Sequence, residues 1–176
     1  GTTVITGNET WNSPRKVLGK IYVAPGARLT IDNITVEFAA YTNFLSRTEV
    51  DLDGELFSNN STLITIQGSD GLWRCMHACG NPANHQSEIS GYRDQGYIRI
   101  RGSHLENAVV ALNNCENPGS GQNGGGIINV RNTQFLNNGR DAQFMKYSNF
   151  LPTNPSLKRK DFSNFVLCDF EVNDNY

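Results

Sequence analysis

At residues 127–138 the chain runs Ile127-Ile128-Asn129-Val130-Arg131-Asn132-Thr133-Gln134-Phe135-Leu136-Asn137-Asn138. Ile128 and Val130 alternate with polar residues, as in a short strand with one apolar face. Asn132 marks a bend, because asparagine tolerates the left-handed backbone region better than most residues. Phe135 resumes the apolar side five residues after Val130. The stretch therefore predicts a strand, a single-residue bend and a second strand.

The same pattern recurs in three other parts of the chain. Residues 97–107 repeat it at an offset of 30, residues 29–36 give a third copy, and residues 165–170 a fourth. In the fourth copy Leu167 stands where asparagine or glycine is expected. The bend residues predicted from the other copies are Asn33, Gly102 and Asn132.

Repeated short strands joined by bends predict a solenoid, since one such unit cannot bury its apolar side alone. We expect an all-β chain that forms a single parallel β-helix domain over residues 1–176. A β-sandwich also has short alternating strands, but it needs tight hairpins, and Asn-Gly occurs at just two places, Asn123-Gly124 and Asn138-Gly139. Long polar loop insertions are expected at about 68–96, 113–126 and 147–160.

Composition excludes several classes of protein. The chain has 176 residues, a hydrophobic content of 38% and a mean hydropathy of -0.45, and no apolar run approaches the length of a membrane span. Its net charge of -2 gives no basic surface for nucleic acid. Asparagine makes up about one residue in eight, which favours many bends and little helix.

Cysteine and histidine gather in the first insertion, at Cys75, His77, Cys79 and His85. Thiolate and imidazole groups are zinc ligands, although this spacing differs from the usual Cys-x2-4-Cys pairs. Cys75 and Cys79 could instead close a short disulfide loop if their Cα atoms lie within about 7 Å, or stay free thiols. All three alternatives remain open from the sequence.

Acidic residues alternate with aliphatic ones at Glu49, Asp51 and Asp53, which predicts a row of carboxylates on one outer face. Oxygen ligands of this kind suit calcium, although neighbouring outward residues are too far apart to share an ion without help from another coil. A solvated acidic stripe is the alternative. No other cofactor is expected.

Arginines at Arg99, Arg101 and Arg131 point outward from two of the copies, with Arg101 and Arg131 in equivalent positions. On successive coils these two charges would lie about 4.8 Å apart, which is unfavourable without a partner. The partner could be the carboxylate of Glu106 or Asp141. It could also be an anionic glycan, because arginine binds carboxylate and sulfate groups bidentately. The aromatic residues expected to stack on such a glycan are Trp73, Tyr92 and Tyr97.

Several of these segments resemble a known class of protein. Residues 19–31, Glu106-Asn107-Ala108, Gly125-Gly126-Ile127-Ile128, 135–138 and 174–176 look like the right-handed β-helical regions of large secreted proteins of Bacteroidota. Those proteins commonly carry a C-terminal type IX secretion sorting domain. The resemblance implies a right-handed parallel β-helix, and a piece of a longer exported protein that acts outside the cell or at its surface. It carries no catalytic residues over.

We therefore expect a non-catalytic structural or adhesive β-helix module, with adjacent domains of the same polypeptide or a surface complex as partners. The alternative is a β-helix that binds or cleaves acidic glycans. Cleavage requires a base and groups that neutralise the substrate carboxylate, and no motif joins the acids, histidines and arginines into one catalytic site.

Overall fold

The computed structural model describes residues 1–40, 47–51, 53–68, 71–87, 89, 94–114 and 124–173. These residues form three parallel sheets of six strands each and one two-stranded antiparallel hairpin, and they contain no helix. In spatial order, sheet A contains β1 (Thr2–Ile5), β4 (Lys20–Val23), β7 (Arg47–Val50), β10 (Cys75–Ala78), β13 (Leu112–Asn113) and β16 (Ala142–Gln143).

The other two sheets run beside sheet A along the same axis. Sheet B contains β2 (Asn8–Trp11), β5 (Arg28–Asp32), β8 (Glu55–Asn59), β11 (Tyr97–Arg101), β14 (Ile127–Arg131) and β19 (Asn164–Val166). Sheet C contains β3 (Arg15–Val17), β6 (Thr35–Phe38), β9 (Thr62–Thr65), β12 (His104–Glu106), β15 (Gln134–Leu136) and β20 (Asp169–Glu171).

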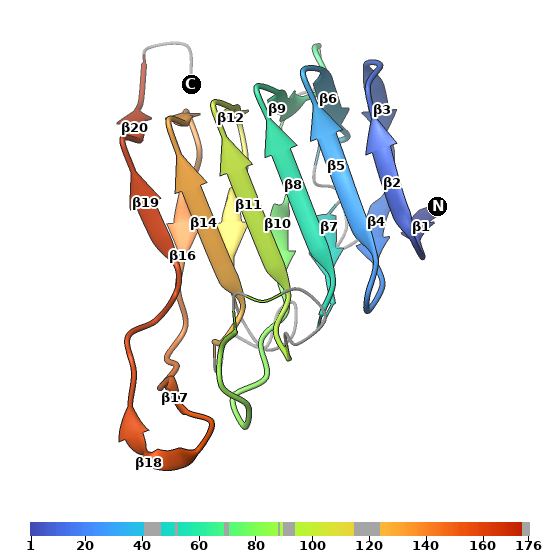
Figure 1. The fold of residues 1–176 in the computed structure, drawn as a ribbon. Helices are drawn as coiled ribbons and strands as arrows, with labels where there is room; N and C mark the ends of the chain where they lie inside the picture. The colour runs from blue at the N-terminus through green and yellow to red at the C-terminus, as the bar shows by residue number, and fades with distance from the viewer. Residues whose placement is uncertain are drawn as a thin grey trace.

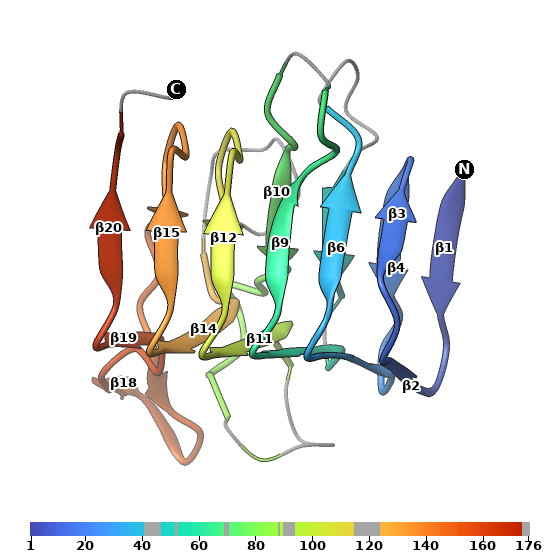
Figure 2. The ribbon, with the colours of Figure 1, turned by 90° about the horizontal axis from the view of Figure 1, so that it is seen from above.

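Each turn of the chain gives one strand to each sheet, so the chain is a parallel β-helix of stacked coils (Figure 1). Figure 2 views the stack from above, with β1 at one end and β20 at the other. The fold prediction is confirmed. The offset of 30 is the actual register of two coils, because Ile98 pairs with Ile128 and Ile100 with Val130.

The core consists of columns of inward side chains that continue from coil to coil. One column contains Val36, Leu63, Leu105 and Phe135, all fully buried. At the first coil Trp11 fills the end of the core, with the Arg15 guanidinium 4.5 Å from its ring centroid. At the last coil Phe170 stacks on Phe135 at 5.0 Å, yet remains 52% exposed.

The structure corrects the insertion boundaries. Residues 68–96 include strand β10, whose Met76 and Ala78 belong to the core. Residues 147–160 include the hairpin of β17 (Phe150–Leu151) and β18 (Asn154–Lys158). Among the described residues, none forms a helix of the length and hydropathy that a bilayer span requires.

Candidate functional site

Single-residue bends connect sheets B and C along one corner of the solenoid. The bend residues are Asn33, Asn60, Gly102, Asn132 and Leu167, with φ of 53°, 45°, 57°, 50° and 54°. Positive φ is easy for glycine and tolerable for asparagine, but costs other residues about 1–2 kcal/mol. The structure thus places the three predicted bend residues in the left-handed region and adds two, of which Leu167 is the strained one.

A small hydroxyl residue follows the bend in three successive coils and turns inward. The hydroxyls of Ser61, Ser103 and Thr133 donate to the carbonyl two residues earlier, at 2.8, 3.0 and 3.0 Å. Ser103 Oγ also accepts from the backbone N–H of Ser61 at 3.3 Å, which links two coils. These buried hydrogen bonds satisfy polar groups at the corner and fix each bend in the same shape.

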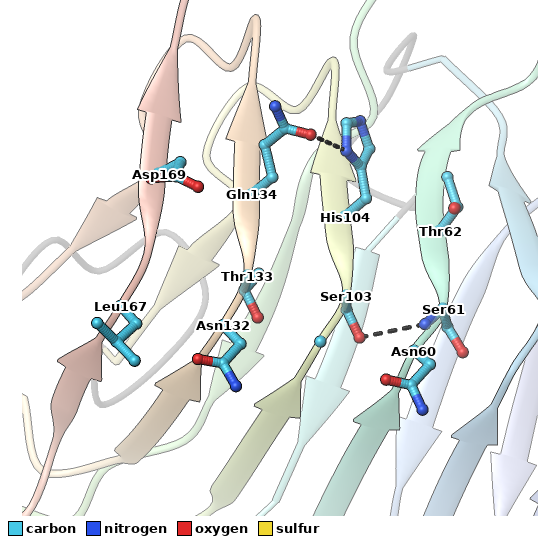
Figure 3. A pocket seen from close by; sticks show the side chains of 11 residues that line it. Asn60, Ser61, Thr62, Ser103, His104, Asn132, Thr133, Gln134, Leu167 and Asp169 are labelled. Atoms are coloured by element: carbon cyan, nitrogen blue, oxygen red, sulfur yellow. Dashed lines mark hydrogen bonds between the residues drawn. The ribbon is translucent and has the colours of Figure 1, made fainter.

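Outside this corner lies a groove of about 540 Å³, which we call the corner groove (Figure 3). This volume falls within the range of about 300–1,000 Å³ typical of ligand clefts. Its lining residues come from four successive coils: Asn60, Ser61, Thr62, Gly102, Ser103, His104, Asn132, Thr133, Gln134, Leu167 and Asp169. The lining is polar apart from Leu167, whose side chain is 73% exposed.

The wall of the corner groove on sheet C is a column of polar side chains in register. Thr62 pairs with His104, His104 with Gln134, and Gln134 with Asp169. His104 Nδ1 lies 2.8 Å from Gln134 Oε1, and its Nε2 lies 3.0 Å from Glu106 Oε2. Both ring nitrogens are therefore engaged, and this wall presents amide, hydroxyl and carboxylate groups.

Arginines stand on the sheet B side of the same corner. Arg101 and Arg131 are direct register partners at the ends of β11 and β14, each immediately before a bend residue. Arg101 Nη1 donates to the carbonyls of Ile100 and Asn129 at 3.0 and 3.1 Å. Burial, together with the charges of Arg99 and Arg131, lowers the pKa of Arg101. Like charges thus gather beside the corner groove.

The carboxylates expected to neutralise these arginines are engaged elsewhere. Glu106 binds His104, and Asp141 accepts from the Asn138 side-chain amide at 2.9 Å. Within the described part of the chain, no carboxylate forms an ion pair with Arg101 or Arg131. Arg99, one position further from the corner, stacks its guanidinium 3.8 Å from the Phe57 ring centroid.

The predicted aromatic platforms are not on this surface. Trp73 is fully buried, stacks on Phe38 at 4.8 Å and donates its indole N–H to the Glu106 carbonyl at 2.8 Å. Tyr97 is 8% exposed, and its hydroxyl accepts from the Asn129 amide at 3.1 Å. Neither ring can stack on a ligand. Tyr92 lies outside the described residues.

Among the described residues, the cysteine and histidine cluster is not a metal-ligating group. Cys75 and Cys79 lie four residues apart along an extended segment, a span of about 13 Å, so no disulfide joins these two residues. Burial, followed by the nearby Glu49 and Asp51, raises the pKa of Cys79 and keeps that thiol protonated. His77 is buried on β10, whereas His85 packs near Phe150.

The described residues contain no group of three or more histidine, cysteine, aspartate or glutamate side chains placed to hold a metal ion. The described residues include Cys75, His77, Cys79 and His85.

The predicted acidic stripe is part of an ion-pair cluster on the outer face of sheet A. Glu49 Oε2 lies 2.7 Å from Lys20 Nζ and 3.2 Å from Arg47 Nη2. Asp51 accepts a hydrogen bond from the Tyr22 hydroxyl, and this bond, with burial, raises the pKa of Tyr22 to about 12. Asp53 leaves the stripe, because it occupies a turn with φ of 58°.

Asn60 and its neighbours are the groove residues that sequence analysis missed. Their signal is a bend residue, then serine or threonine, then an apolar residue two positions on, which recurs at residues 60–63, 102–105 and 132–135. Strand β8 was not predicted as a copy of the repeat, because Ser58 occupies a core position where the other copies have an aliphatic residue. Its hydroxyl lies 3.1 Å from Ser103 Oγ.

Comparison with known proteins found no family model, no curated protein and no solved structure that matches this chain.

Proposed function

We propose that this chain is a non-catalytic adhesive β-helix module of an exported protein, and that it binds an acidic glycan along the corner groove. The observation that carries the proposal is the register of Arg101 and Arg131 beside a polar groove that crosses four coils. Two guanidinium groups on adjacent coils attract an anion that bridges them, because arginine binds carboxylate and sulfate groups in a planar, bidentate manner.

The lining of the corner groove supports a carbohydrate as the ligand. Asn60, Asn132 and Gln134 offer amide donors and acceptors, and Thr62 and Asp169 offer hydroxyl and carboxylate oxygens. Sugar hydroxyl groups both donate and accept, so such a mixed wall can pair with them. The exposed Leu167 supplies an apolar surface for the carbon face of a sugar ring.

The scaffold supports an adhesive role. The backbone of the groove is fixed by bends and by parallel ladders between its coils, so little backbone order has to be created on binding. The coil spacing of about 4.8 Å repeats the groups along the solenoid axis, which suits an extended polymer better than a compact small molecule. Export and an extracellular or cell-surface location belong to this proposal.

A glycan array that includes carboxylated, sulfated and neutral polysaccharides tests the function, followed by calorimetry on the best ligand. We expect binding to acidic glycans that weakens with added salt. Arg101→Ala and Arg131→Ala should each reduce affinity by about tenfold, the effect of losing one charge-assisted hydrogen bond. Arg140→Ala, which removes an exposed arginine outside the groove, is the matched control and should bind normally.

Three results would contradict the proposal. They are the absence of binding to every acidic glycan, equal binding of neutral glycans, and unchanged affinity in both groove variants. Incubation of the same glycans with the protein, followed by product analysis, separates adhesion from cleavage. Release of shorter oligosaccharides that is lost in His104→Ala would assign the chain to the polysaccharide-cleaving β-helices instead.

A further inference from the structure

His104 lies in the middle of the groove wall, where its imidazole ring contacts two polar side chains. It stands on β12, with Thr62 and Gln134 as its register partners on the neighbouring coils. His104 Nδ1 lies 2.8 Å from Gln134 Oε1 (Figure 3), and its Nε2 lies 3.0 Å from Glu106 Oε2. The side chains of His104 and Glu106 are 26% and 22% exposed, so the ring can exchange protons with solvent.

Both atoms that face the ring are oxygens that accept hydrogen bonds. Glu106 Oε2 belongs to a carboxylate, and Gln134 Oε1 is the carbonyl oxygen of an amide. A neutral imidazole carries one N–H group, whereas an imidazolium carries two. The arrangement around His104 therefore satisfies the protonated ring, which donates to Glu106 and to Gln134 at the same time.

Loss of the proton makes one of these two contacts unfavourable. The remaining N–H stays on Nε2, because the ionised carboxylate of Glu106 can only accept. His104 Nδ1 then presents a lone pair to Gln134 Oε1, and two acceptors 2.8 Å apart repel each other. A half-turn of the Gln134 amide removes this repulsion, since the amide N–H then donates to the ring and the shape of the side chain is unchanged.

The same half-turn exchanges the atom that Gln134 offers to the corner groove. In Figure 3 the amide oxygen of Gln134 points towards His104, and the amide nitrogen points away from it. Because Gln134 lines the groove, the wall presents an N–H donor beside a positive charge while His104 is protonated. After deprotonation the wall presents a carbonyl oxygen, and the positive charge is gone.

We propose that His104 is a positioning residue that sets the hydrogen-bonding character of the corner groove through the Gln134 amide. The protonated ring makes the wall a donor, and the neutral ring makes it an acceptor. The consequence for ligands rests on the proposed function: acidic glycans bind more tightly at lower pH. Their sulfate and carboxylate groups accept hydrogen bonds, so they gain from both the donor and the charge.

The described residues that face His104 identify its own proton as the one that changes. The facing residues on β9 and β15 are Thr62 and Gln134, which do not titrate. Glu106, on β12 itself, is the charged partner, and Asp169 on β20 lies beyond Gln134. Histidine is the side chain whose charge ordinarily changes between about pH 5 and pH 8, and the guanidinium groups beside the groove keep their charge.

Nuclear magnetic resonance of the isotope-labelled chain, between about pH 5 and pH 8, tests the switch without a ligand. We expect the His104 ring to change from two N–H groups to one on Nε2. The side-chain amide resonances of Gln134 should shift over the same pH interval, and Gln134→Leu assigns them by removing them. His104→Gln should abolish this shift. His85→Gln is the matched control, because His85 packs near Phe150 and does not line the groove, and it should leave the shift unchanged.

Calorimetry with a sulfated polysaccharide measures the consequence for binding, since sulfate keeps its charge over this range. Affinity should fall by about tenfold as the pH rises, the effect of one lost charge-assisted hydrogen bond. The fall should be absent in His104→Gln and unchanged in His85→Gln. Gln134→Leu should reduce the fall without abolishing it, because the charge of the His104 ring still changes.

The two measurements distinguish failure of this inference from failure of the proposed function. Gln134 resonances that do not follow the His104 ring, or that shift equally in His104→Gln, overturn the switch whether or not a glycan binds. Binding with the same pH dependence in His104→Gln as in the original chain also overturns it. Absence of binding to every acidic glycan overturns the proposed function, and the Gln134 resonances then still decide the switch. Circular dichroism melting confirms that each variant is folded.

Discussion

The solenoid has two surfaces on which charged side chains stack on neighbouring strands, and the two differ in how those charges are paired. On sheet A, Glu49 lies between Lys20 and Arg47, and Tyr22 donates to Asp51. Beside the corner groove, Arg101 and Arg131 are also stacked on neighbouring strands, but the described carboxylates do not pair with them. The first surface is satisfied by the chain itself. At the second, Arg101 Nη1 donates to two backbone carbonyls instead of a carboxylate.

This contrast separates stability from recognition. A charge that pairs within the fold stabilises it and has little left to offer a ligand. A charge without a carboxylate partner contributes little to the free energy of unfolding, so substitution of that residue should cost little stability. The following predictions use this difference, beginning with the largest expected effect.

Glu49→Gln should lower the free energy of unfolding by about 2 kcal/mol, because two partly buried cations lose their shared carboxylate. The value is below that of a fully buried pair, since Lys20 and Arg47 side chains remain 22% and 18% exposed. Urea denaturation measures it. Arg131→Gln, beside the corner groove, is the control and should change the same quantity by less than about 0.5 kcal/mol. If both variants lost the same free energy of unfolding, the proposed difference between the two surfaces would be wrong.

Asn132→Val should lower the free energy of unfolding by about 1–2 kcal/mol, because a β-branched residue is strained at φ of 50°. Asn132→Gly should stay close to the original stability, since glycine adopts this conformation without a Cβ clash. Thermal melting of both variants checks the pair. If valine and glycine gave the same melting temperature, the bends would not be the element that holds the groove wall.

Stability should decline at alkaline pH through Tyr22. Its pKa rises from 10.0 to about 12 in the folded chain, so between these values the folded state holds a proton that the unfolded state has lost. The contribution of Tyr22 is fully present below pH about 10 and disappears as pH rises towards about 12. Tyr22→Phe should flatten this part of the stability curve. An unchanged slope, measured by denaturation across that range, would contradict the assignment.

Much of the fold could be predicted from spacing alone. The pairs of apolar residues around Gly102 and Asn132 gave the solenoid, the bends and the register of β11 and β14, because core columns repeat identical local geometry. Leu167 is neither asparagine nor glycine, the residues expected at a bend, yet its backbone has the same positive φ as the other bend residues. The position is therefore set by the coil geometry, and the residue adapts at a cost.

Other features could not be predicted from the sequence, because they depend on which segments cover each strand. Local sequence patterns do not contain this information. Strand β10 looked like a polar loop because Cys75, His77 and Cys79 alternate with its core residues, and all three are buried from the outer side. Trp73 and Tyr97 looked like exposed platforms for the same reason. The groove depends on Asn60 and on four coils lying side by side, which is a tertiary property.

The longest connections occur at one corner of the coil. The connections from sheet A to sheet B lengthen towards the C-terminal end, at 79–96, 114–126 and 144–163, whereas one bend residue joins sheets B and C in each of the last five coils. The largest insertions thus lie at the A-to-B corner, while the C-to-A connections vary less, from two residues at 18–19 to nine at 66–74. For protein engineering, this makes the A-to-B corner a place to graft a foreign peptide, with the spacing of the groove wall left untouched.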